Sequence, residues 1–148
     1  MQKELFPHIK HLGYGGLLPF VGLLGGLLMF ADEHPWHATL VDAIRFYAAL
    51  IITFVGALNW GIGLKADELS ISQRQTLLTY SVIPSLLSWL LLMLSADVAL
   101  IAFGLLYIGC YGIDLRFTLT AMPSEYQVMR RRLSFSVAGI LLMASQLV

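Results

Sequence analysis

Charged residues are scarce in this chain of 148 residues. Asp, Glu, Lys and Arg together make up 12% of it, about half the share of roughly 25% that is usual in soluble proteins. Hydrophobic residues make up 58%, and the mean hydropathy is +0.79. This composition excludes a water-soluble globular domain and a disordered chain, because so little polar surface cannot cover a core this apolar.

Several residue patterns that carry recognisable chemistry are also missing. The one cysteine, Cys110, excludes a disulfide framework and a zinc site built from cysteines. Nine acidic and nine basic residues balance, so there is no basic excess for binding nucleic acid. The sequence contains no Ser-His-Asp arrangement, phosphate-binding loop or Cys-x-x-Cys motif. We therefore assign no catalytic residues, expect a protein that is not an enzyme, and identify no cofactor.

Long apolar runs are what the chain has instead. A helix crosses the roughly 30 Å hydrocarbon core of a bilayer with about 20 apolar residues. We predict an all-α integral membrane bundle of five transmembrane helices that forms a single domain, 1–148. The expected spans are 12–30, 40–64, 77–94, 98–115 and 125–148. The first run is longer than the apolar region of a signal peptide, about 7–15 residues, so we expect it to be a membrane helix.

Short-range signals predict where these helices begin, touch and bend. The spacing of a capping box predicts helix starts at Thr39 with Asp42, Ser72 with Gln75, and Ser124 with Gln127. Small residues four apart let membrane helices approach closely, which predicts helix contacts at Gly22 with Gly26 and at Ala57 with Gly61. Pro19 and Pro84 each free a backbone carbonyl. Such a carbonyl either lines a cavity or is bound by a neighbouring helix.

The distribution of basic residues predicts the orientation of the bundle. The side that holds the N-terminal tail, the second connection and the fourth connection carries eight of the nine Lys and Arg: Lys3, Lys10, Lys65, Arg74, Arg116, Arg130, Arg131 and Arg132. The opposite side carries Arg45. Because connections rich in Lys and Arg stay in the cytoplasm, we expect the N-terminus inside and the C-terminus outside a bacterial inner membrane.

Polar and aromatic side chains gather toward the same cytoplasmic end. One interpretation is an interfacial belt of Trp and Tyr with arginines that reach the headgroups. The other is a ligand-binding pocket, whose candidate residues are Asn59, Trp60, Tyr80, Tyr107, Tyr111, Asp114 and Arg130. We expect Asn59 to face other helices, since an amide without hydrogen bonds is costly in lipid. We expect Asp114 to form an ion pair with Arg130 or Arg116.

The first outer connection contains candidate metal ligands. His34 and His37 lie three residues apart beside Asp32 and Glu33, and imidazole and carboxylate groups are zinc ligands. Their spacing matches no established zinc motif, and Pro35 limits helix formation there. We therefore expect a solvated loop rather than a metal site.

A series of short motifs resembles a known family. The motifs are LGYGGLLPF at 12–20, FVGALNWG at 54–61, PSLLSW at 84–89, then Asp114, and then Met122-Pro123 with Tyr126 and Arg130. Over nearly its whole length the chain resembles an uncharacterised membrane family, a domain of unknown function, that includes transmembrane protein 69. The resemblance implies a five-helix protein of bacterial inner membranes and mitochondria with no established activity. The chain departs from it at Asn59, where the family often has His.

Two functions remain open at this point. The first is an accessory, assembly or partner-binding module of a larger membrane complex, in contact with the lipid bilayer and with another membrane protein or a second copy of itself. The alternative is the handling of a small apolar ligand, such as a porphyrin, quinone or lipid, in a pocket at the cytoplasmic end. The first predicts glycine faces turned outward. The second predicts that Asn59 and the aromatic side chains surround a void.

Overall fold

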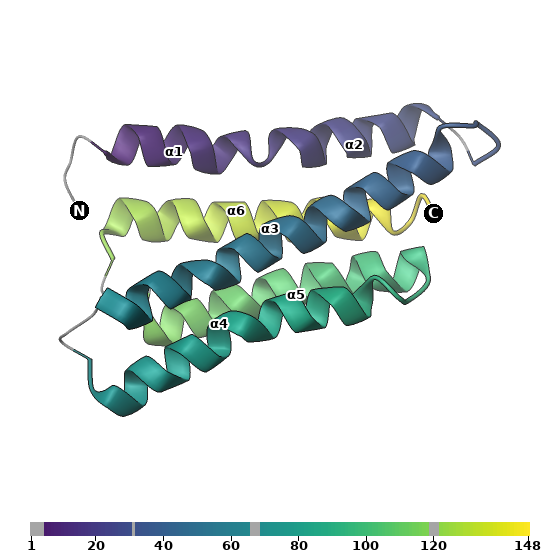
Figure 1. Ribbon diagram of the computed structural model, residues 1–148. Coiled ribbons are helices and arrows are strands. Elements are labelled where there is room, and N and C mark those ends of the chain that lie inside the picture. Colours follow the sequence, from purple (N-terminus) through teal and green to yellow (C-terminus); the bar gives the residue numbers. More distant parts are fainter. Residues whose placement is uncertain (1–4, 31, 66–68, 119–121) are drawn as a thin grey trace.

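The structure is a computed structural model that describes residues 5–30, 32–65, 69–118 and 122–148. In these residues, all the regular secondary structure is helical. The helices are α1 (Phe6–Gly15), α2 (Leu18–Met29), α3 (His37–Lys65), α4 (Ile71–Leu91), α5 (Ala96–Phe117) and α6 (Ser124–Ala144). α1 and α2 follow one another along a single line, so the helices form a bundle of five rods (Figure 1). The predicted all-α architecture is confirmed.

The first predicted helix, 12–30, differs from the structure at both its start and its middle. α1 begins at Phe6, and the helix is interrupted at Gly16 and Leu17, just before Pro19. The proline ring clashes with the carbonyl four residues earlier and supplies no N–H, which explains the break. The Tyr47 hydroxyl donates a hydrogen bond to the Gly16 carbonyl oxygen at 3.0 Å. A carbonyl at the break is therefore bound by a neighbouring helix.

The helix starts differ from the predicted capping boxes. α4 does begin with one, but Ser70 and Gln73 form it: the Ser70 Oγ accepts a hydrogen bond from the Gln73 N–H at 3.3 Å, and the Gln73 Oε1 accepts from the Ser70 N–H at 2.9 Å. α3 begins at His37, and α6 begins after Pro123 without a side-chain cap. The three predicted boxes are therefore wrong, but the helix start predicted at Ser124 is confirmed, since α6 begins there. Ser70 and Ser72 each have a Gln three residues later, so spacing cannot choose between them.

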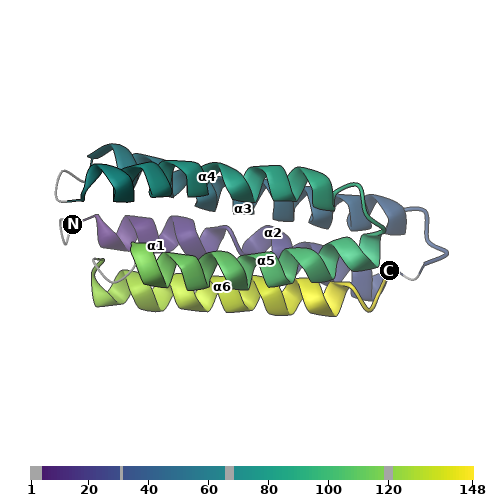
Figure 2. The ribbon, with the colours of Figure 1, turned by 90° about the horizontal axis from the view of Figure 1, so that it is seen from below.

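The helices pack side by side in pairs. α3 lies antiparallel to α4, α5 lies antiparallel to α6, and α2 lies against both α3 and α6, antiparallel to the first and parallel to the second (Figures 1 and 2). Large buried side chains fill the apolar core between the helices; they include Phe20, Ile44, Ile52, Phe103 and Leu141. Tyr107 is buried in this core, and its hydroxyl donates a hydrogen bond to the Ala48 carbonyl oxygen at 2.9 Å.

Three helical segments are long and apolar enough to cross a membrane: Phe6–Met29, His37–Lys65 and Ala96–Phe117. α4 and α6 each have 21 residues. They carry more polar side chains in their first halves, including Arg74 and the run Arg130–Arg132. By composition, α4 and α6 are therefore less clear as candidate membrane spans than the other three segments.

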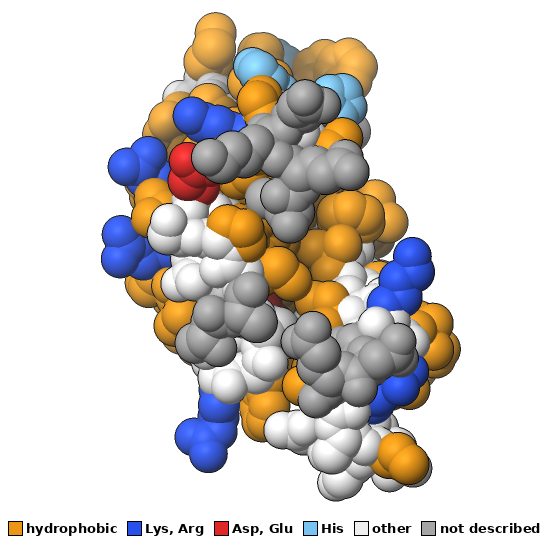
Figure 3. Space-filling model, turned by 90° about the vertical axis from the view of Figure 1, so that its left-hand side faces the viewer, with side chains coloured by type: hydrophobic (Ala, Val, Ile, Leu, Met, Phe, Trp, Pro, Cys, Tyr) orange, Lys and Arg blue, Asp and Glu red, His pale blue; other side chains and the backbone are white. Residues whose placement is uncertain are grey.

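The alternating directions of the helices bring most basic residues to one end of the bundle. The starts of α1, α4 and α6 and the ends of α3 and α5 meet there (Figure 1). This basic end carries Lys10, Lys65, Arg74, Arg116, Arg130, Arg131 and Arg132. Lys3 lies outside the described residues. In Figure 3, which looks onto this end, Lys and Arg side chains lie around its periphery.

Two arginines bind the ends of neighbouring helices. Near the opposite end, Arg45 of α3 donates from Nη2 to the carbonyl oxygens of Leu92 and Leu94, at 2.8 and 2.9 Å. At the basic end, Arg74 of α4 donates from Nε to the Gly63 carbonyl oxygen at 2.8 Å. The last carbonyls of a helix have no partner within that helix, so these side chains supply the missing donors.

Close approach of helices occurs at Gly56 rather than at Ala57 and Gly61. A Cβ atom added to Gly56 would lie 2.9 Å from the Ser81 carbonyl oxygen and 3.0 Å from the Pro84 Cγ. The prediction for Gly26 is confirmed, because it lies against the Leu40 side chain of α3. Gly22 and Gly61, in contrast, have no described atom within 4 Å of an added Cβ. The predicted contacts at these two glycines are therefore wrong within this chain.

The crossing of α3 and α4 provides a first test. Gly56→Ala is expected to destabilise the protein by about 1–3 kcal/mol, as overpacking does, because the new methyl group meets the backbone of Ser81. The measurement is the Tm of the purified protein in detergent. Gly61→Ala makes the same change on the open side of the same helix, and its Tm should stay level or rise, since Ala favours helix more than Gly. Equal Tm values for the two variants would contradict the packing described.

Candidate functional site

A cluster of four polar side chains lies inside the bundle near the basic end. Asn59 of α3, Asp114 of α5, and Arg130 and Ser134 of α6 are each no more than 6% exposed. Arg130 donates to the Asp114 Oδ2 from Nη2 at 2.8 Å and from Nε at 3.2 Å. Its Nη1 donates to the Ser134 Oγ at 2.8 Å. The Asn59 Nδ2 donates to the Asp114 Oδ1 at 3.2 Å. We call these four residues the polar cluster.

The polar cluster balances its own charge. It contains one carboxylate and one guanidinium, so its net charge is zero, and both carboxylate oxygens accept hydrogen bonds. Removing two charges from water costs several kcal/mol per ion, and only good geometry with further hydrogen bonds compensates that cost. Asn59 and Ser134 supply those further hydrogen bonds. The arrangement therefore joins three helices and provides hydrogen-bond partners for both carboxylate oxygens.

Two predictions about this cluster are confirmed. Asn59 faces other helices, and Asp114 is paired with Arg130. Arg116, the other predicted partner, is exposed on the surface of α5. Ser134 was not among the residues predicted from the sequence. Its position four residues after Arg130 was the available signal, because residues i and i+4 share one face of a helix.

The cavity beside the polar cluster is small. Asn59, Asp114, Arg130 and Tyr126 are among the residues that line it, and its volume is about 20 Å³. That is room for about one water molecule, whereas pockets for small ligands measure about 300–1,000 Å³. This volume does not favour a porphyrin, a quinone or a lipid between Asn59 and Asp114.

The aromatic candidates lie apart from the cluster or are engaged in packing. Trp60 is 47% exposed, on an outer face of α3. Tyr107 is fully buried in the apolar core. Tyr111 packs against Phe135, with the ring centroids 5.7 Å apart. Of the candidate residues, the structure thus brings together Asn59, Asp114 and Arg130. Ligand binding by any of the candidates stays a prediction.

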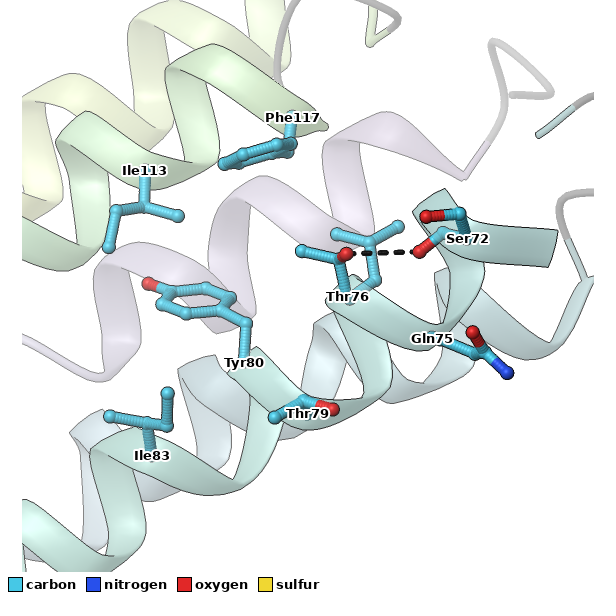
Figure 4. Close-up of a pocket in the computed structure, with 9 residues that line it drawn as sticks. Ser72, Gln75, Thr76, Thr79, Tyr80, Ile83, Ile113 and Phe117 are labelled. Carbon is cyan, nitrogen blue, oxygen red and sulfur yellow. Dashed lines mark hydrogen bonds between the residues drawn. The ribbon is translucent and has the colours of Figure 1, made fainter. Parts of the chain in front are cut away.

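Tyr80 lines a separate groove between α4 and α5, with a volume of about 480 Å³. Figure 4 shows its ring extending from α4 toward Ile113 of α5, with Phe117 beyond. The Tyr80 hydroxyl lies 3.4 Å from the Cys110 carbonyl oxygen, to which it donates a long hydrogen bond. Hydroxyl groups such as that of Thr76 line the α4 side, and the described lining contains no charged side chain. The groove is therefore polar on one wall, apolar on the other and neutral.

His34 of the α2–α3 connection and His37 at the start of α3 belong to no metal-binding group in the described residues. No group of three or more His, Cys, Asp or Glu in this part of the chain is arranged to hold a metal ion. The His37 Nε2 lies 3.0 Å from the Leu147 carbonyl oxygen and 3.1 Å from the Asp32 Oδ1. The His34 Nδ1 accepts a hydrogen bond from the Trp36 N–H at 3.2 Å. His37 thus links the start of α3 to the C-terminal segment.

Comparisons with known proteins identify a family of unknown function and a curated relative. The family described as "Protein of unknown function (DUF3429)" matches residues 6–146. Transmembrane protein 69 of Xenopus tropicalis is 29% identical over 142 residues, which cover 91% of this chain and 54% of that protein. The chain therefore spans about half the length of this curated relative. No solved structure matches the chain.

The polar cluster predicts strong coupling between its two charges. Asp114→Asn or Arg130→Gln alone should each destabilise the protein by about 3–5 kcal/mol, because each leaves a buried charge without its partner. The double variant should lose less stability than the sum of the single variants. The measurement is a double-mutant cycle on thermal unfolding in detergent.

Arg116→Gln is the matched control for this cycle, since it removes an exposed arginine from the helix that carries Asp114. It should change the stability little and show no coupling to Asp114→Asn. Additive effects for Asp114 and Arg130 would refute the pairing as the source of stability.

Proposed function

We propose that this chain, which belongs to the DUF3429 family of proteins of unknown function, is a non-enzymatic, multi-pass membrane protein. In this proposal it serves as an accessory or assembly module within a larger membrane complex. The observation that carries the proposal is the placement of its small residues. The cavity beside the polar cluster has room for about one water molecule, and a Cβ atom added to Gly22 or Gly61 would meet no described atom within 4 Å. The small residues that another helix could contact thus lie on the outer faces of the bundle.

We propose that all five rods cross the membrane. Three of them qualify on length and composition. α4 and α6 have 21 residues each, which is about 31 Å at 1.5 Å per residue, close to the thickness of the hydrocarbon core. Two of their arginines have partners inside the protein: Arg74 binds the end of α3, and Arg130 is paired within the bundle.

The proposed orientation places the basic end in the cytoplasm and the C-terminus outside. Its support is the charge distribution, since eight of nine Lys and Arg belong to one side and basic connections are retained in the cytoplasm. The proposed location is a bacterial inner membrane.

Reporter fusions after Lys65, Ser95, Thr118 and Val148 distinguish five spans from three. With five spans the fusion points lie, in order, inside, outside, inside and outside. If only the three most apolar rods crossed, the order would be inside, inside, outside and outside. Each fusion is measured with one reporter that is active only outside and a second that is active only inside, so that every position gives a positive signal. A fusion after Val148 that is active only in the cytoplasm would contradict the proposed orientation.

One outward face of α3 supports the partner-binding role. Phe54, Ala57, Leu58 and Gly61 follow the i, i+3, i+4, i+7 spacing of one helix face, and all four are exposed. In a membrane, apolar side chains gain nothing by leaving lipid, and small residues promote helix association by letting backbones approach closely. Ala57 and Gly61 supply this feature. The face fits a transmembrane helix of another protein or of a second copy.

Substitution on this face tests the role. Gly61→Leu should remove the close-contact surface, so an assembly larger than the monomer, purified from native membranes in mild detergent, should revert toward the monomer. Gly112→Leu is the control, because Gly112 also faces open space but lies on α5 without a small residue four positions away. The measurement is the size of the purified species by size-exclusion chromatography with light scattering. A monomeric wild-type protein, or equal loss in both variants, would argue against the proposal.

A further inference from the structure

A second groove at the basic end lies between α1 and α6, with a volume of about 310 Å³. Its polar lining comes from Lys10 and Tyr14 of α1 and from Ser124, Glu125 and Arg132 of α6. Phe6 and Val128 contribute apolar surface. This groove is distinct from the polar cluster and from the neutral groove that Tyr80 lines.

The charges of this groove favour an anion. Lys10 and Arg132 supply two positive charges against the single carboxylate of Glu125. Within the described residues, neither Lys10 nor Arg132 takes part in an ion pair. The start of α6 adds to the positive potential, since Pro123 provides no side-chain cap for the first N–H groups of that helix. In Figure 3, an acidic side chain lies among basic ones in the upper part of this end.

The apolar surface of the groove indicates what else the ligand carries. Phe6, Val128 and Met129 supply apolar groups to the same lining, and Val128 and Met129 lie between Glu125 and Arg132 along α6. Tyr14 has both an aromatic ring and a hydroxyl group, a combination that is typical of side chains at the membrane interface. A ligand that satisfies both parts has a negatively charged head and an apolar tail. Basic pockets between membrane helices recognise the headgroups of anionic lipids in this way.

We propose that the α1–α6 groove binds an anionic membrane phospholipid of the leaflet at the basic end. Its phosphate lies between Lys10 and Arg132, the hydroxyls of Tyr14 and Ser124 donate hydrogen bonds to it, and an acyl chain covers Phe6 and the exposed Val128. The neutral groove between α4 and α5 is larger, but its described lining carries no charge and gives it no preference for such a lipid. Charge, rather than volume, selects the α1–α6 groove.

Lipid binding by the purified full-length protein tests this proposal. Native mass spectrometry in detergent with an equal mixture of phosphatidylglycerol and phosphatidylcholine measures how much of each lipid stays bound. The wild-type protein should retain phosphatidylglycerol preferentially. Lys10→Gln and Arg132→Gln should each weaken that binding about fivefold, the factor that corresponds to about 1 kcal/mol for each basic side chain near a membrane surface.

Two further variants separate the groove from the general charge of this end. Arg131→Gln removes the same charge from the adjacent exposed residue, which does not line the groove, and should leave the binding unchanged. Glu125→Gln removes the carboxylate that opposes the phosphate and should strengthen the binding. This gain cannot arise from a loss of folding, so it keeps the test decisive if Lys10→Gln or Arg132→Gln unfolds.

Several outcomes would overturn the proposal. Equal retention of the two lipids would show that the groove does not select an anionic headgroup. An equal loss with Arg131→Gln and Arg132→Gln would reduce the effect to general surface charge. Full competition by inorganic phosphate at the lipid's own concentration would identify a free anion, rather than a lipid, as the occupant. These outcomes do not depend on whether Gly61 contacts a partner, so this inference and the accessory role fail independently.

Discussion

Asp114 and Arg130 carry opposite charges into a part of the bundle where both side chains are buried, and the positions of three helices depend on how that pair is completed. A buried pair compensates for its lost hydration only when geometry and additional hydrogen bonds are favourable. Here the additional bonds come from Asn59 on α3 and Ser134 on α6. Each residue of a helix advances by about 100° around its axis. A rotation of α6 by one residue would therefore withdraw Arg130 from Asp114, and the pair restricts how these helices turn.

The same constraint governs the helix ends. Backbone groups without water need partners inside the protein, and side chains of neighbouring helices supply them. Arg45 binds the carbonyls that follow α4, Arg74 binds those at the end of α3, and Tyr47 binds the Gly16 carbonyl at the break between α1 and α2. Arg45, the one basic residue on its side of the predicted topology, thus has a structural reason to lie there.

The interior of the bundle leaves little room for a ligand, so its binding surfaces lie on the outside. The cavity next to the polar cluster holds about one water molecule by volume, so the cluster is better suited to hold helices together than to enclose an organic ligand. The outer surfaces differ in chemistry. The face with Gly61 is small and apolar, the groove with Tyr80 is neutral, and the groove with Lys10 and Arg132 is positively charged. A membrane protein with these surfaces is suited to contacts with helices and lipids.

Composition and residue spacing alone determined that this protein is helical, where most of its helices lie, and that Asn59, Asp114 and Arg130 share one depth. Depth follows from counting residues along a helix, because each residue adds a fixed rise of 1.5 Å. The family resemblance was also present in the order of its motifs and is confirmed. Rotation about the helix axis was decided only by tertiary packing. It selected Arg130 over the exposed Arg116 and placed Gly56 rather than Gly61 against α4. It also turned Trp60 outward. Local sequence sets how far along a helix a side chain lies, but the neighbouring helices decide which way it points.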